Sequence, residues 1–141
     1  MTAYKGQQNY QDDVGKLLLR VALALLLLFH GISKMTGGVG FISAMLAKAG
    51  LPGLLAYLVY VGEVLAPLLI LGGLFTRAAA AAVVINMVVA ILLVHTGDVF
   101  TLSKTGGWAL ELQGMYLATA LVVAMVGAGR FSIGGTGGRF N

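Results

Sequence analysis

This 141-residue chain contains no cysteine, and only 10% of its residues are charged. Without a thiol, the protein cannot exchange disulfides, hold an iron–sulfur cluster or bind a metal through thiolates. The absence therefore excludes the disulfide-forming enzymes that occur among small four-helix membrane proteins.

The residues that are present are mostly apolar. They make up 59% of the chain, and the mean hydropathy is +0.95, far above the usual range for a soluble domain. The formal net charge is +4, but the Lys and Arg residues stand singly at the ends of apolar runs, as membrane anchors do. The composition therefore predicts an integral membrane protein in contact with the lipid bilayer, and no nucleic-acid partner.

Four apolar runs predict an all-α, four-transmembrane-helix bundle with spans at about residues 17–35, 54–72, 77–95 and 108–127. We expect a membrane domain over residues 16–128, between a polar N-terminal tail (1–15) and a glycine-rich C-terminal tail (129–141). The run from residue 41 to 49 is too short to span, which favours a short outer interfacial or re-entrant helix. Two glycines followed by Thr76 predict a sharp turn with Thr76 as the next N-cap.

The basic residues predict the orientation of the bundle. Four spans place both termini on one side, and that side carries six Lys or Arg residues against three on the other. Because basic residues favour the cytoplasm, both termini are expected to be cytoplasmic. Two strips of small residues, on the third and fourth spans, favour a homo-oligomer; these are Ala79, Ala82 and Ala90, and Gly114 and Ala118.

Three ionisable residues mark one face of the first span. At about 100° per helical residue, Arg20, His30 and Lys34 fall within an arc of roughly 80°. Charged groups in hydrocarbon are costly and face a bundle interior, a water-filled cavity or the headgroups. This face is therefore expected to point toward the other helices.

Glu63 is the most informative residue of the second span, because it lies about 13 Å from the start of that span. A carboxylate at this depth must be protonated or paired. His30 and Lys34 are both plausible partners, and Pro67 cannot donate to the Glu63 carbonyl, which leaves a backbone acceptor nearby. Two interpretations stay open: a polar pair that only fixes helix packing, and a ligand or proton site.

The remaining polar candidates are Glu111, Asn86 and His95. Glu111 lies one turn inside Trp108 and is expected to face water at the headgroup level, although it is kept as a candidate for the polar site. His95 lies nearly 180° around the helix from Asn86, so the two are not expected to face one interior. Two histidines can ligate haem or a metal, but this placement does not favour either.

Several motifs together resemble the DoxX family. They are Leu19-Arg20 leading to His30-Gly31 and Lys34, then GLPG (50–53), Glu63 with LLILGGLFTR (68–77), and GAGRFSIGG (127–135). The resemblance implies that the family's recurring polar positions are filled by Arg20, His30, Lys34, Glu63, Thr76 and Arg77. The acidic residue usual after the final serine is absent, since Gly134 and Gly135 stand there.

The resemblance implies a small bacterial inner-membrane protein associated with quinone-linked or oxidative-stress redox systems. We therefore expect an accessory subunit with an intramembrane polar site at His30, Lys34 and Glu63, which binds a quinone or a partner oxidoreductase. That interpretation predicts an apolar cavity beside His30 and Glu63. The alternative is a non-catalytic scaffold or a carrier of small molecules or protons; the sequence does not decide whether the protein is an enzyme.

Overall fold

The computed structural model describes residues 2–141, and their side chains from Asn9 onward. The first helix, α1, runs from Thr2 to Gly37. The helix therefore includes most of the segment expected to be a polar tail (1–15). Met1 lies outside the described residues. The difference has a simple cause, because a helix that has already formed extends at little cost through good helix formers such as Gln11 and Lys16.

A second crossing follows a short connector. Helix α2 (Gly40–Lys48) occupies the position expected for the short helix. The chain then continues through a 3-10 turn (Gly53–Leu58), a π-helical turn (Val61–Leu65) and helix α3 (Ala66–Gly72). These pieces form one apolar helical stretch from Gly53 to Gly72, so the second run folds as predicted but is not a regular α-helix.

The turn between α3 and α4 (Thr76–Val94) follows the prediction only in part. Gly73 ends α3 in the left-handed conformation, with φ of 69°, as expected for a C-cap glycine. The prediction of Thr76 as N-cap is wrong, because Phe75 holds that position with φ of 47°. The Thr76 hydroxyl instead donates to the Asn141 side chain at 3.0 Å.

The last helix, α5, runs from Glu111 to Val126 and starts later than the sequence predicts. Trp108 belongs to the connector rather than the helix, since its backbone forms a bridge with Leu102 and its indole N–H donates to the Val99 carbonyl at 2.7 Å. The Trp108 ring also lies over Gly114, where an added Cβ would be 2.7 Å from Cζ3. Gly114 is therefore covered within the chain.

Within residues 2–141 the structure is helical and has no strand. Three helical stretches are long and apolar enough to cross a membrane: Asn9–Gly37, Gly53–Gly72 and Thr76–Val94. Helix α5 has 16 residues, or about 24 Å at helical rise, somewhat less than the roughly 30 Å of a bilayer core.

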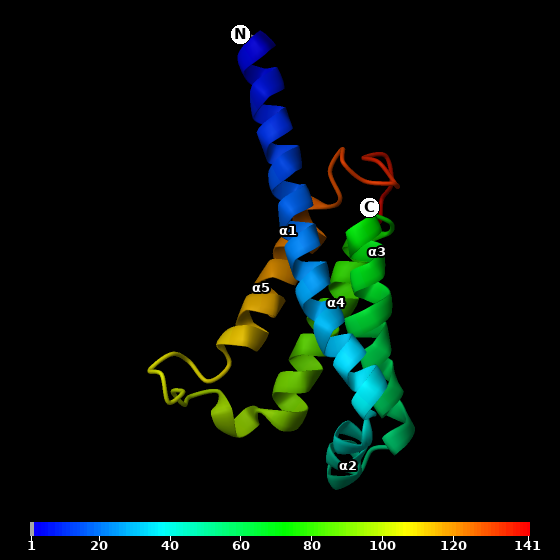
Figure 1. The fold of residues 1–141 in the computed structure, drawn as a ribbon, viewed down its shortest axis with the longest axis vertical. Coiled ribbons are helices and arrows are strands. Elements are labelled where there is room, and N and C mark those ends of the chain that lie inside the picture. The colour runs from blue at the N-terminus through cyan, green and yellow to red at the C-terminus, as the bar shows by residue number, and fades with distance from the viewer. Residues whose placement is uncertain (1) are drawn as a thin grey trace.

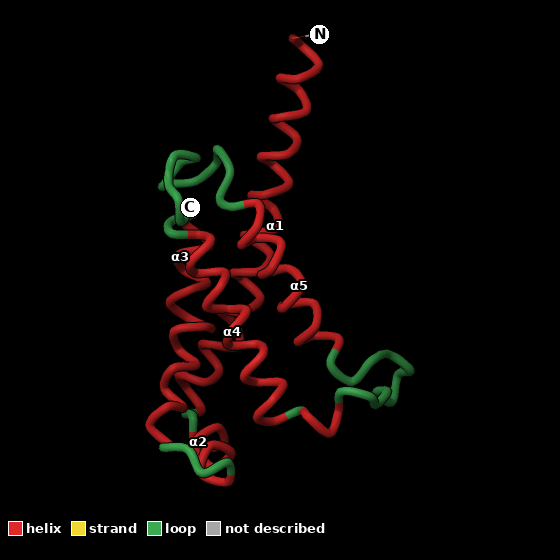
Figure 2. Tube along the Cα trace, turned by 180° about the vertical axis from the view of Figure 1, so that it is seen from behind, coloured by secondary structure: helices red, strands yellow, loops and turns green. Residues whose placement is uncertain are grey.

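Helix α4 packs against α5, α3 and the π-helical turn, whereas α1 packs against α3, α5 and the same turn. Figure 1 shows the two chain ends and the α3–α4 turn toward one end of the molecule, with α2 and the α4–α5 connector toward the other. Figure 2 shows α5 diverging from α4 toward that connector. The largest buried apolar cluster joins α1, α3, α4 and α5 through small and branched side chains, among them Leu27, Ile70, Ala80, Val83 and Ala120.

The C-terminal segment after α5 folds back over the end of the bundle that holds the α3–α4 turn. Asn141 accepts from the Thr76 hydroxyl, and its main-chain oxygen accepts from Arg77 Nε at 3.1 Å. Gly134 N–H donates to the Gly73 carbonyl at 3.1 Å, and a Cβ at Gly134 would lie 2.8 Å from that oxygen. Gly134 therefore has little room for a side chain.

Candidate functional site

A cavity of about 620 Å³ opens between α1, the π-helical turn, α4, the start of α5 and the α2 region. Most of its lining is aliphatic or aromatic. The polar or titratable side chains in the lining are His30, Lys34, Glu63, Asn86, His95, Gln113 and Tyr116. Mostly apolar concave sites with a few convergent polar groups are typical of ligand-binding pockets.

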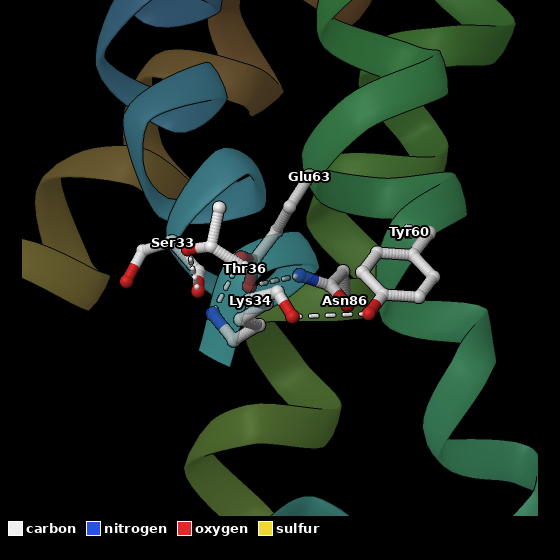
Figure 3. A network of polar contacts seen from close by, with 6 residues as sticks. All are labelled: Ser33, Lys34, Thr36, Tyr60, Glu63 and Asn86. Atoms are coloured by element: carbon white, nitrogen blue, oxygen red, sulfur yellow. Dashed lines mark hydrogen bonds and ion pairs between the residues drawn. The ribbon is translucent and has the colours of Figure 1, made fainter. Parts of the chain in front are cut away.

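Glu63 is the centre of a polar network on the wall of this cavity. Its Oε2 accepts from Lys34 Nζ at 2.5 Å, and its Oε1 accepts from Asn86 Nδ2 at 3.3 Å. Figure 3 shows these side chains converging from three separate segments, with the Tyr60 hydroxyl donating to the Lys34 carbonyl. The Glu63 side chain is 7% exposed, against 28% for Lys34, so the carboxylate is the more deeply buried partner.

The local backbone explains how Glu63 faces two neighbours. Pro67 cannot supply the usual amide donor four residues on, and the chain here makes a π-helical turn in which Ala66 N–H donates to the Val61 carbonyl. Single π-helical turns shift the register of a helix and are frequent at functional sites. The turn places Glu63 between α1 and α4.

Two glycines allow the three segments to approach closely. A Cβ added at Gly31 would overlap the Glu63 carbonyl oxygen and lie 2.7 Å from Val64 Cγ2. A Cβ at Gly62 would lie 2.5 Å from the Asn86 Cβ. These contacts are shorter than van der Waals distance, so hydrogen is the only substituent that fits at either position.

His30 lies in the same cavity but does not join the ion pair. Its ring packs edge to face on Tyr116 of α5, with 5.7 Å between ring centroids. Of the two partners that the sequence allows for Glu63, the structure has Lys34.

At the end of α4, His95 forms a second polar group. Its Nδ1 lies 2.9 Å from Asp98 Oδ2, and its Nε2 lies 3.4 Å from Gln113 Nε2 on α5. The prediction that Asn86 and His95 cannot face one interior is wrong, since both line the cavity. Helical angles do not extend to His95, because α4 ends at Val94 and His95 has φ of −120° and ψ of 17°.

Arg20 and Glu111 do not line this cavity. Arg20 lies 14 residues before Lys34, about 21 Å along the helix axis. Its guanidinium is buried and donates to the carbonyls of Ala128 at 2.6 Å and Phe131 at 3.0 Å. Glu111 is exposed at the start of α5 and is absent from the cavity lining.

Comparison with known proteins agrees with the sequence motifs. The DoxX family model matches residues 15–96 of this chain. The chain belongs to the DoxX family. It is also similar to "Putative oxidoreductase CatD" of Bacillus subtilis (strain 168), with 30% identity over 110 residues. The aligned region covers 78% of this chain and 81% of that protein. No solved structure matches the chain.

Family membership and the apolar helices together make this a DoxX membrane protein. The polar positions picked out by the resemblance divide into two groups in space. His30, Lys34 and Glu63 line the cavity, whereas Arg20, Thr76 and Arg77 bind the C-terminal segment. Within the described residues, no three His, Asp or Glu side chains are grouped as a metal site.

The sequence assigns no role to Asp98, Gln113 or Tyr116. The His95–Asp98 spacing of three residues just beyond an apolar run was a usable signal, because side chains three apart can meet across a turn. Gln113 and Tyr116 carried no such signal, since their contacts come from packing of α5 against α4 and α1.

Proposed function

We propose that this DoxX protein binds a lipid-soluble, quinone-like ligand in the cavity beside Glu63 and His30, as an accessory subunit of a membrane redox system. The observation that carries the proposal is the cavity itself: about 620 Å³ of mostly apolar space with the Lys34–Glu63–Asn86 network on its wall. This volume lies in the usual range for small-molecule pockets, about 300–1,000 Å³.

The ion pair supports a binding site for an uncharged molecule. Lys34 and Glu63 neutralise each other at 2.5 Å, so the network adds polarity without a net charge. A charged ligand would lose its hydration on entering the apolar cavity without finding an unpaired counter-ion there, which is costly. Quinones are uncharged, apolar over most of their surface and carry carbonyl oxygens that accept hydrogen bonds.

The relative named as an oxidoreductase supports a link to redox chemistry. The proposal includes four spans in a bacterial inner membrane, with both termini cytoplasmic, and association with a partner oxidoreductase and with further copies of the chain. Native mass spectrometry in mild detergent measures the copy number. Labelling of a single cysteine placed at Ser103, in the α4–α5 connector, tests the orientation, because an impermeant thiol reagent should reach it from the periplasmic side.

Ligand binding can be tested with one filled-cavity variant and one matched control. Ala90 lines the cavity, whereas Val88 on the same helix is 40% exposed and does not. Decylubiquinone should quench the fluorescence of Trp108, the single tryptophan, saturably in the wild type and in Val88→Phe. Ala90→Phe should abolish the saturable quenching because the added ring fills the space.

Two results would overturn this proposal. One is the absence of saturable binding to the wild type in lipid nanodiscs. The other is unchanged binding to a folded Ala90→Phe variant, which would show that the ligand binds elsewhere.

A further inference from the structure

His95 and Gln113 form a second polar group in the cavity, separate from the Glu63 network. Both residues line the cavity where α4 ends and α5 begins. The His95 ring is held in place, because Nδ1 contacts Asp98 Oδ2 at 2.9 Å and the Asp98 N–H donates to the His95 carbonyl at 3.0 Å. The imidazole is therefore fixed by its own turn rather than by the helix.

Glu63 and His95 differ in how many of their side-chain hydrogen-bonding atoms already have close partners. Both carboxylate oxygens of Glu63 already accept hydrogen bonds, from Lys34 and Asn86. His95 Nε2 has only a 3.4 Å contact with the Gln113 amide, longer than the usual 2.7–3.2 Å of a protein hydrogen bond. With Nδ1–H donated to the Asp98 carboxylate, the doubly protonated imidazole still has an Nε2–H that can donate to an arriving carbonyl oxygen, and the Gln113 amide N–H can donate to the same oxygen. Neither contact requires the Lys34–Glu63 ion pair to break.

We propose that His95 and Gln113 bind the oxygen-bearing head of an uncharged lipid-soluble ligand, and that Asp98 positions His95 for this role. The ligand body then lies along the α4 face that lines the cavity, from His95 past Ala90 toward Asn86. Asn86 and His95 are nine residues apart, which corresponds to about 14 Å along a helix. This inference deepens the proposed function and rests on it.

The surroundings of His95 explain why the head binds at this end and is uncharged. The Asp98 side chain is 50% exposed, so this end of the cavity adjoins the surface while the rest is apolar. The other titratable groups in the lining are His30, Lys34, Glu63 and Tyr116. Lys34 and Glu63 neutralise each other, and Asp98 is occupied by His95, so no unpaired fixed charge faces the ligand head.

A pair of probes tests the assignment: decylubiquinone, and decylbenzene, which has an aromatic ring and the same tail but no oxygen atoms. Binding of each is measured by Trp108 fluorescence, directly or by competition, on protein in lipid nanodiscs. His95→Leu should weaken decylubiquinone binding about ten-fold, as expected for the loss of one hydrogen bond. It should leave decylbenzene binding unchanged. His30→Leu, which removes the other imidazole from the same cavity, should preserve the ratio of the two affinities.

The outcomes separate this inference from the proposed function. If the wild type binds neither probe, the proposed function fails and this inference fails with it. If the wild type binds decylubiquinone but His95→Leu leaves the ratio of affinities unchanged, only the role of His95 is wrong.

Photo-cross-linking of the wild type tests the position of the ligand head even if His95→Leu does not fold. A quinone with a photoreactive azide on its ring should form cross-links within residues 93–99 or 110–114, and excess decylubiquinone should suppress them. Cross-links confined to residues 30–34 and 61–66 would place the head at the Glu63 network and overturn the assignment.

Discussion

Removing the ammonium from Lys34 tests the energetic role of the Glu63 network. Lys34→Met keeps most of the aliphatic stem but leaves the Glu63 carboxylate with Asn86, at 3.3 Å, in place of the 2.5 Å ion pair. Because the Glu63 side chain is only 7% exposed, it must stay charged without its counter-ion or take up a proton. Either change destabilises the folded protein.

The size of the effect follows from the unequal burial of the two partners. Breaking a fully buried pair by removal of one partner costs about 3–5 kcal/mol. The Lys34 side chain is 28% exposed, so the pair is only partly buried, and we expect a loss of about 2–3 kcal/mol. Glu63→Gln should cost less, about 1 kcal/mol, because the amide still accepts one hydrogen bond and the freed Lys34 can reach water.

The double variant separates the pair from the individual side chains. Lys34→Met combined with Glu63→Leu removes both charges, and it should be at least as stable as Lys34→Met alone, because no unpaired carboxylate remains. Unfolding in mild detergent, followed by circular dichroism, measures the double variant, its two single variants Lys34→Met and Glu63→Leu, and Glu63→Gln. Lys48→Met is the control: Lys48 is exposed in the last turn of α2 and has no ion pair within the described residues.

One pattern of results would refute this reasoning. If Lys34→Met and Glu63→Leu each destabilise the protein and their effects simply add in the double variant, the two side chains are not energetically coupled. The ion pair between them would then contribute nothing to the free energy of unfolding.

Two further variants test other close contacts, with unfolding in detergent as the common assay. Gly31→Ala should destabilise the protein by about 1–3 kcal/mol through overpacking against Glu63, whereas Gly15→Ala, with nothing within 4 Å of its added Cβ, should stabilise α1 by up to about 1 kcal/mol; equal effects would contradict the close approach. Arg20→Met should cost about 2–4 kcal/mol and expose residues 127–141 to protease, because two carbonyls lose a buried donor. Arg130→Met should cost under about 1 kcal/mol, since that side chain is 64% exposed and 3.8 Å from Asp13; a larger loss would be unexpected.

The sequence alone was sufficient for the membrane class and for most helices. Continuous apolar runs have one low-energy solution in lipid, the α-helix, because every backbone polar group must be satisfied within the segment. The same argument predicted a partner for Glu63, since an unpaired carboxylate at that depth is too costly. Both conclusions depend on local composition and depth, which can be counted along the chain.

The identity of contacts between segments was decided only by the tertiary structure. Lys34 rather than His30 pairs with Glu63 because a π-helical turn and two glycines set how the three segments meet. His95 reaches the same cavity as Asn86 because α4 ends one residue earlier. Helical periodicity describes one regular helix, and it carries no information once the helix ends or a neighbour approaches through a glycine.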